Sequence, residues 1–166
     1  FGMSLKEHGL VKWADVIHIH WANHGFIQIK EIEKWKKPVV WTLRDMWAFT
    51  GGCHYSFDCN KFESGCGACI ALNSFNKNDL STKVLDFKRS SFKVSNIYWV
   101  AISSWIKNKA ERSVLLKDEL ISIIPSGVDS NHYSLLDKDL VRKKLNLPLT
   151  KKIIIMGATN IRQEFK

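Results

Sequence analysis

Short apolar runs typical of buried β-strands alternate along this chain with stretches of helical periodicity. The expected strands are rich in β-branched and aromatic residues and lie at 15–21, 39–43, 97–103 and 120–125. The expected helical stretches lie at 26–36, 79–95, 104–116 and 138–147, and a further strand is expected at 151–158. Strands and helices that alternate at this spacing form βαβ units. The sequence therefore predicts an α/β fold, a Rossmann-like parallel sheet with helices on both faces.

The periodicity also predicts which side of each helix is buried. In the first helical stretch, the expected buried residues recur at helical spacing and are Phe26, Ile29, Ile32 and Trp35. In the stretch at 79–95, the expected buried side consists of Leu80, Val84, Phe87, Ser91 and Val94. Ser103 or Ser104 is placed to cap the helix that follows.

The charge balance narrows the choice of partners. The chain has 166 residues, with 25 lysines and arginines against 16 acidic residues and a net charge of +9 at pH 7. Such an excess favours nucleic acid, acidic lipid headgroups or phosphorylated substrates, although most basic residues fall on ordinary solvated helix faces. No apolar run approaches the ~20 residues that cross a bilayer, and the start lacks a secretory pattern, so we expect a cytoplasmic protein.

All four cysteines lie in one short stretch, as Cys53, Cys59, Cys66 and Cys69. The last two are separated by two small residues, which is the tight spacing of a zinc knuckle. Four clustered thiols in a reducing cytoplasm favour a structural zinc site, with His54 as a substitute ligand. Free thiols without metal and two disulfides are the alternatives. Four protein ligands leave no open position, so we expect no catalytic cofactor.

Polar residues follow the first expected strand, at the end where parallel sheets carry their functional loops. We expect His20, Trp21, His24 and Gly25 to bind hydroxyl or phosphate groups of a ligand, since glycine lets the backbone approach closely. A structural role is the alternative for His20. His18 lies within the strand and is predicted to be a hydrogen-bonded core histidine.

A charged pair ends the second expected strand. Arg44 suits bidentate binding of a phosphate or carboxylate, and Asp45 could accept a hydrogen bond from a hydroxyl. The alternative is a structural contact between the two residues that caps the loop.

Several segments together resemble the pattern of glycosyltransferase family 4, within the GT-B superfamily. In chain order they are "ADVIHIHW", "KPVVWTLRDMWAFTGGCHYSFDC", "WVAISSWI", "IIPSGVD" and "KKIIIMGATN". The likeness is most specific in "TLRDMWAFTGGCHY" and points to the subgroup that builds bacterial capsule, exopolysaccharide or O-antigen chains. Two departures stand out: Arg44 replaces a histidine that many members have, and Ser126 replaces an asparagine.

The resemblance implies a partial N-terminal acceptor domain at 1–135, an interdomain connection at 136–150 and the start of a nucleotide-sugar-binding domain at 151–166. The site residues that it implies are Asp45 and Arg44 at the reacting centre, His20, Trp21, His24 and Gly25 at the acceptor, and Gly157 and Lys166 at the donor phosphates. Most of the donor domain would follow residue 166, so residues 1–166 alone should be inactive.

The implied function is that of a hexosyltransferase in cell-surface polysaccharide synthesis. A sugar would pass from a nucleotide-sugar donor to a glycan or polyprenyl-diphosphate-linked acceptor, with retention of anomeric configuration. The positive charge suits an anionic surface at the inner face of the membrane. The alternative is a non-enzymatic, zinc-stapled basic module that binds nucleic acid through tryptophans and charge. It is less favoured because most of Trp13, Trp35, Trp41, Trp99 and Trp105 fall on expected core faces.

Overall fold

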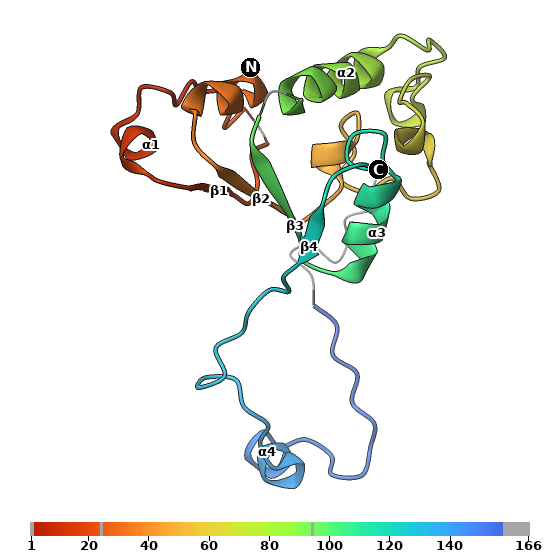
Figure 1. Ribbon diagram of the computed structural model, residues 1–166. Coiled ribbons are helices and arrows are strands. Elements are labelled where there is room, and N and C mark those ends of the chain that lie inside the picture. The colour runs from red at the N-terminus through yellow and green to blue at the C-terminus, as the bar shows by residue number, and fades with distance from the viewer. Residues whose placement is uncertain (1, 24, 94, 158–166) are drawn as a thin grey trace. The chain divides into compact units, whose positions relative to one another are not determined.

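The computed structural model describes residues 2–23, 25–93 and 95–157, and the chain divides into two compact units, Phe1–Ser126 and Gly127–Lys166. The first unit is built on a four-stranded sheet (Figure 1). Its strands follow the order of the chain and are β1 (Ile17–Ile19), β2 (Val39–Leu43), β3 (Ile97–Ala101) and β4 (Ile121–Ile123). Every neighbouring pair is parallel. The predicted α/β, Rossmann-like parallel sheet is confirmed.

α-Helices and 3₁₀ helices connect the strands. The α-helices of the first unit are α1 (Gly9–Trp13), α2 (Leu80–Phe92) and α3 (Ser104–Arg112), and the 3₁₀ helices are η1 (Ile29–Trp35), η2 (Trp47–Phe49), η3 (Lys61–Glu63) and η4 (Ile70–Leu72). The predicted cap of α3 is confirmed, because the Ser103 side chain accepts a hydrogen bond from the Ile106 N–H. In η1 the buried residues Ile29, Ile32 and Trp35 recur every third position, which matches the three residues per turn of a 3₁₀ helix.

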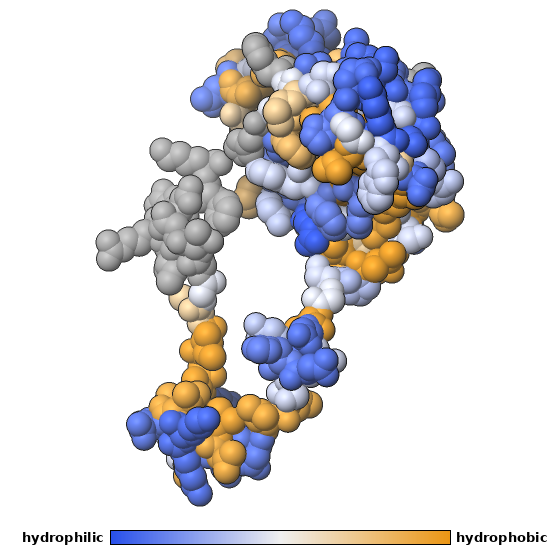
Figure 2. Space-filling view, turned by 90° about the vertical axis from the view of Figure 1, so that its left-hand side faces the viewer, coloured by the Kyte–Doolittle hydropathy of each residue, from blue (hydrophilic) through white to orange (hydrophobic). Residues whose placement is uncertain are grey.

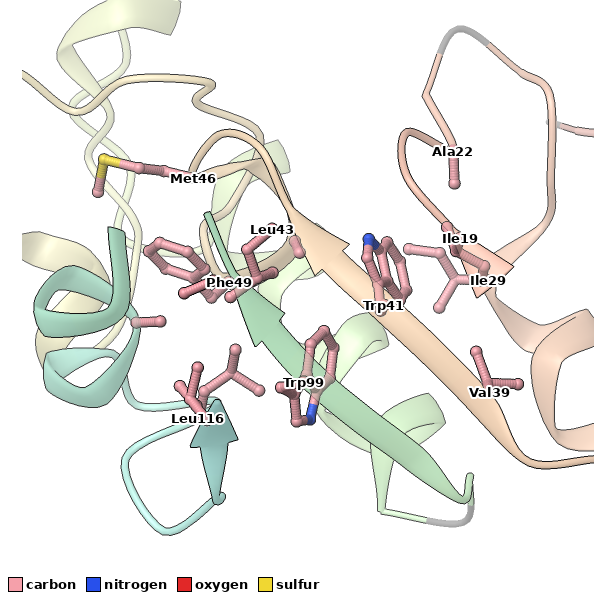
Figure 3. Close-up of a cluster of buried hydrophobic side chains, with 14 of the residues drawn as sticks. Ile19, Ala22, Ile29, Val39, Trp41, Leu43, Met46, Phe49, Trp99 and Leu116 are labelled. Carbon is pink, nitrogen blue, oxygen red and sulfur yellow. The ribbon is translucent and has the colours of Figure 1, made fainter. Parts of the chain in front are cut away.

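The core lies against one face of the sheet. Trp41 of β2 and Trp99 of β3 are register partners whose rings stack with centroids 5.4 Å apart (Figure 3). Phe92 at the end of α2 meets both rings edge-on. The same cluster includes buried residues of η1 and α3, so helices cover this face. Of the tryptophans expected in the core, Trp35, Trp41 and Trp99 are buried, whereas Trp13 and Trp105 are exposed.

The opposite face carries the alternate residues of the strands. His18, Val40 and Tyr98 are register partners in one row of this face. His18 is exposed and Tyr98 is 58% exposed, so the sheet is open to solvent around them. We expected helices on both faces of the sheet. At this row of residues, helices in the described part of the chain cover one face and leave the other open.

Helix α2 buries Ser91 as predicted, but most of its buried side differs from the predicted one. Its buried residues are Ser81, Leu85, Lys88 and Ser91, whereas Leu80 and Phe87 are exposed. The reason is that Lys88 points inward and bonds to backbone carbonyls of the preceding loop. Those contacts rotate the polar side of the helix toward the protein, which the apolar pattern alone could not reveal.

The second unit contains α4 (Lys138–Lys144), which begins after Asp137, whose carboxylate accepts a hydrogen bond from the Leu140 N–H. Residues 152–157 have no regular secondary structure, so the strand predicted there is not formed. A strand needs a hydrogen-bonded neighbour, and the described part of this unit contains no other strand. Ile154, Ile155 and Met156 are exposed, and apolar side chains of this unit appear orange in Figure 2. No helix within the described ranges is both long and apolar enough to cross a membrane.

Candidate active site at the carboxyl ends of β1 and β2

Asp45 lies two residues beyond the end of β2 and collects three hydrogen bonds. Its Oδ1 accepts from the Trp47 N–H at 2.9 Å, and its Oδ2 accepts from Trp21 Nε1 at 3.3 Å. The third partner is His54, whose Nδ1 lies 2.6 Å from the same Oδ2. Side chains from the end of β1, the end of β2 and the cysteine-containing loop therefore meet at one carboxylate. The Asp45 side chain is 17% exposed and that of His54 is 43% exposed, so a ligand in solution can reach this pair.

A second polar group lies at the same strand ends. Arg44 Nε and Nη2 lie 3.4 and 3.3 Å from His20 Nδ1. The rings of His18 and His20 have centroids 4.1 Å apart, and His18 Nε2 lies 2.8 Å from Thr42 Oγ1. The prediction of a core position for His18 is wrong because its face of the sheet is open, although the residue is hydrogen-bonded as expected.

The electrostatics favour a neutral His20. Its pKa is lowered by desolvation and also by the charges of His18 and Arg44. A neutral imidazole can accept the hydrogen bond that the Arg44 guanidinium donates to Nδ1. Arg44 contacts His20 in the structure, whereas Asp45 contacts His54. The alternative of a structural contact between Arg44 and Asp45 is therefore not seen among the described residues.

A small pocket joins the two groups. It is lined by residues from the ends of β1 and β2, among them His20, Trp21, Asn23, Arg44, Asp45 and Trp47. Asn23 was not predicted from the sequence, yet its side chain is buried and its Nδ2 has no hydrogen-bond partner within the described residues. Buried amide groups are normally paired. The position of Asn23 just after the first strand is the sequence signal that could have included it.

The buried Lys88 of α2 supports the loop that carries Asp45. Its Nζ donates hydrogen bonds to the carbonyl oxygens of Trp47 and Thr50, the latter at 2.8 Å, and lies 3.8 Å from the centroid of the Trp47 ring. Burial lowers the pKa of Lys88 to about 7, while negative charge on Cys66, Asp45 and Cys53 acts in the opposite direction. Lys88 thus fixes the turn between Asp45 and the cysteines.

The four cysteines are half-buried and free, so the alternative of two disulfides is not seen. Burial raises the pKa of the Cys53 and Cys66 thiols, and negative charge on neighbouring cysteines raises it further. Within the described residues, no group of three or more His, Cys, Asp or Glu side chains is arranged so that it could hold a metal ion. His54, the expected substitute ligand, is directed to Asp45 instead.

The remaining predicted site residues are distributed as follows. Gly25 lies in the loop after β1 with φ of +75°, a conformation that glycine adopts readily. Gly157 belongs to the second unit, at the end of its irregular segment. His24 and Lys166 lie outside the described residues. The structure therefore brings together His20, Trp21, Arg44 and Asp45 and adds His54 and Asn23 to them.

Polar side chains gathered beyond the carboxyl ends of parallel strands define the usual ligand site of α/β proteins. The chain is similar to the putative colanic acid biosynthesis glycosyl transferase WcaC of Escherichia coli (strain K12), with 33% identity over 84 residues. The match covers 47% of this chain and 21% of WcaC, so it spans about a fifth of that relative. No protein-family description matches the chain, and neither does any solved structure. The similarity supports a glycosyltransferase family.

Proposed function

We propose that this chain supplies the acceptor side of a glycosyltransferase of family 4, with the GT-B architecture, that acts in cell-surface polysaccharide synthesis. The observation that carries the proposal is the meeting of Trp21, Asp45 and His54 at the strand ends, in a chain similar to a glycosyl transferase. The enzyme would transfer a hexose from a nucleotide-sugar donor to a glycan or polyprenyl-diphosphate-linked acceptor, with retention at the anomeric carbon.

Asp45 and His54 would orient the acceptor hydroxyl. Because Asp45 Oδ2 accepts the hydrogen bond from His54 Nδ1, the tautomer with its proton on Nδ1 is favoured, and Nε2 is left as an acceptor. The Nε2 of the half-exposed ring can then accept a hydrogen bond from the attacking hydroxyl. Asp45 already holds three partners, so we assign it the task of fixing His54 and Trp21 rather than direct contact alone.

Arg44 would bind an anionic group of the acceptor. Its guanidinium is exposed, and only some of its five N–H groups face His20. The remaining donors suit a diphosphate oxygen, which a planar guanidinium binds bidentately. The net charge of +9 favours the same partner and the anionic inner face of a cytoplasmic membrane.

Retaining transfer without a protein nucleophile would depend on stabilising the leaving diphosphate and positioning the hydroxyl. In this proposal the domain divisions are 1–135, 136–150 and 151–166, and Gly157 and Lys166 belong to the donor side. A glycine that follows the first strand of a nucleotide-binding domain lets phosphate approach the backbone. The chain described here would then contribute the acceptor groups to a cleft completed by the donor domain.

The proposal is tested with the whole protein that contains this chain. It is incubated with UDP-glucose, UDP-galactose, GDP-mannose and GDP-fucose, each labelled in the sugar, together with a polyprenyl-diphosphate-linked sugar. Transfer of label to the lipid-extractable product from one donor supports the proposal, and NMR of the new linkage reads its anomeric configuration. Absence of transfer from every nucleotide sugar, with strongly salt-dependent binding to single-stranded oligonucleotides, would instead support the nucleic-acid-binding alternative.

A further inference from the structure

The loop between β2 and α2 is long and has little regular secondary structure. Residues 44–79 contain three single-turn 3₁₀ helices and neither strand nor α-helix. Of the large apolar side chains between Cys53 and Cys69, Phe62 is buried, while Tyr55 and Phe57 are exposed. Ordering so long a segment costs conformational entropy that a small apolar core offsets poorly.

The segment Cys66–Cys69 is nevertheless fixed in a tight turn. The Thr82 hydroxyl donates to the Cys66 carbonyl at 3.0 Å, and the Cys69 N–H donates to Asp79 Oδ2 at 2.8 Å. Gly67 has φ of +134°, and a Cβ there would lie 2.2 Å from the Lys77 carbonyl oxygen. Only glycine fits this position, so the start of α2 and the turn itself hold Cys66 and Cys69 in place.

The segment that carries Cys53 lies directly against this turn. A Cβ built on Gly51 would lie 3.0 Å from Cβ of Cys66. The backbone two residues before Cys53 therefore lies beside the Cys66 side chain.

We propose that Cys53, Cys59, Cys66 and Cys69 bind one zinc ion, which closes this loop and holds His54 where it meets Asp45. Binding would release the four thiol protons and form four zinc–sulfur bonds. Among the described residues no three of these thiols are arranged to hold an ion, so the ion would have to draw their side chains together. Metal binding would supply free energy that the loop lacks. The zinc site itself does not depend on the proposed transferase activity. The role of zinc in positioning His54 for catalysis does rest on the proposed function.

Two neighbours of the thiols fit this assignment. Four thiolates around one zinc ion carry a net charge of about −2, and the buried Lys88 side chain bonds to the carbonyl of Thr50, three residues before Cys53. His54 follows Cys53 directly but is bonded to Asp45, which leaves four sulfurs as the tetrahedral set. In this proposal Cys53 binds the metal, and the adjacent His54 belongs to the candidate active site.

The test is elemental analysis of the chain purified without added metal or chelator, followed by exchange into cobalt(II). We expect about one zinc per chain and, with cobalt, the visible absorption of tetrahedral thiolate coordination. The Cys66→Ser/Cys69→Ser double variant should lose both signals, whereas Ser64→Ala in the same loop should keep them. Native thiols should react slowly with a disulfide reagent until a chelator is added.

The outcomes separate the proposal from its alternatives. Wild-type protein that is free of metal, binds no cobalt and has four rapidly reacting thiols overturns it. Two disulfides in protein purified under reductant overturn it as well, and so does full zinc retention in a Cys53→Ser variant. If the double variant does not fold, the cobalt spectrum and thiol reactivity of the wild type still decide the question. Metal bound by a whole protein that transfers no sugar from any nucleotide sugar would leave the zinc site standing and reject the proposed function.

Discussion

His54 Nδ1 lies 2.6 Å from Asp45 Oδ2, and this contact joins the cysteine-containing loop to the end of β2. Asp45 is placed by the sheet, since it follows a central strand whose residues are almost fully buried. His54 is placed by the loop, since it lies between Cys53 and the exposed Tyr55. The geometry of the candidate site therefore depends on how well this loop is ordered.

Two substitutions of His54 separate orientation of Asp45 from contact with the acceptor. Asparagine places an amide near the position of Nδ1, whereas glutamine reaches the position of Nε2. We expect His54→Asn to lower kcat of the whole enzyme about 10-fold or more, because it keeps the bond to Asp45 and loses the acceptor at Nε2. His54→Gln should recover part of the loss. Full activity in His54→Asn would mean that His54 only positions Asp45.

We expect substitution of Arg44 to weaken acceptor binding more than it slows turnover. Arg44→Ala removes a charge-assisted hydrogen bond, so we expect KM for a polyprenyl-diphosphate-linked acceptor to rise about 10-fold with a smaller change in kcat. The comparison is with Lys83→Ala, which removes one exposed positive charge from α2. Equal effects of the two variants would show that only the overall charge matters.

The sheet was predictable because each strand is a continuous apolar run, which a parallel sheet with a packed face requires. Helix α2 shows where the pattern fails. Lys88 is a residue type that is almost never fully buried, and it is inside because carbonyls of Trp47 and Thr50, about forty positions earlier, accept its hydrogen bonds. Such long-range contacts leave no periodic trace in the helix itself.

The candidate site was predictable in part. His20, Trp21, Arg44 and Asp45 directly follow strands, and the carboxyl ends of neighbouring parallel strands meet. The partner of Asp45 was not predictable, because no periodicity relates it to a histidine in a loop without regular structure. The exposed position of His18 also depends on which face of the sheet the helices cover, and one sequence does not settle that.

Asp79 should make stability depend on pH. Hydrogen bonds from the Ser81 hydroxyl and from the Cys69 N–H hold its pKa well below the ordinary value of 3.8. The unfolded chain then takes up the proton at higher pH than the folded chain, so the stabilisation is complete above 3.8 and is lost as the pH falls below it. In urea titrations of the chain, Asp79→Asn should be less stable than wild type at neutral pH and approach it in acid. Asp58→Asn, an exposed loop change, should show no such convergence; a pH-independent difference for Asp79→Asn would contradict the account.

Lys88 should matter for stability as well as for charge. Lys88→Met keeps much of the side-chain volume but leaves the carbonyls of Trp47 and Thr50 without their buried donor, so we expect the free energy of unfolding to fall by about 1–3 kcal/mol. Chemical denaturation of the chain, with Lys83→Met on the exposed side of α2 as the matched control, measures this loss. A Lys88→Met variant as stable as the control would show that burying the ammonium costs as much as its hydrogen bonds contribute.

The most direct measurement is the turnover of Asp45→Asn in the whole enzyme, with the nucleotide sugar that the wild type uses. Asparagine keeps the size of the side chain and removes the charge that holds His54 and Trp21. Loss of one charge-assisted hydrogen bond predicts a fall in kcat of about 10- to 100-fold at an unchanged melting temperature, while Asp58→Asn remains at the wild-type rate. Transfer by Asp45→Asn at the rate of the Asp58→Asn control would contradict the placement of the active site at the ends of β1 and β2.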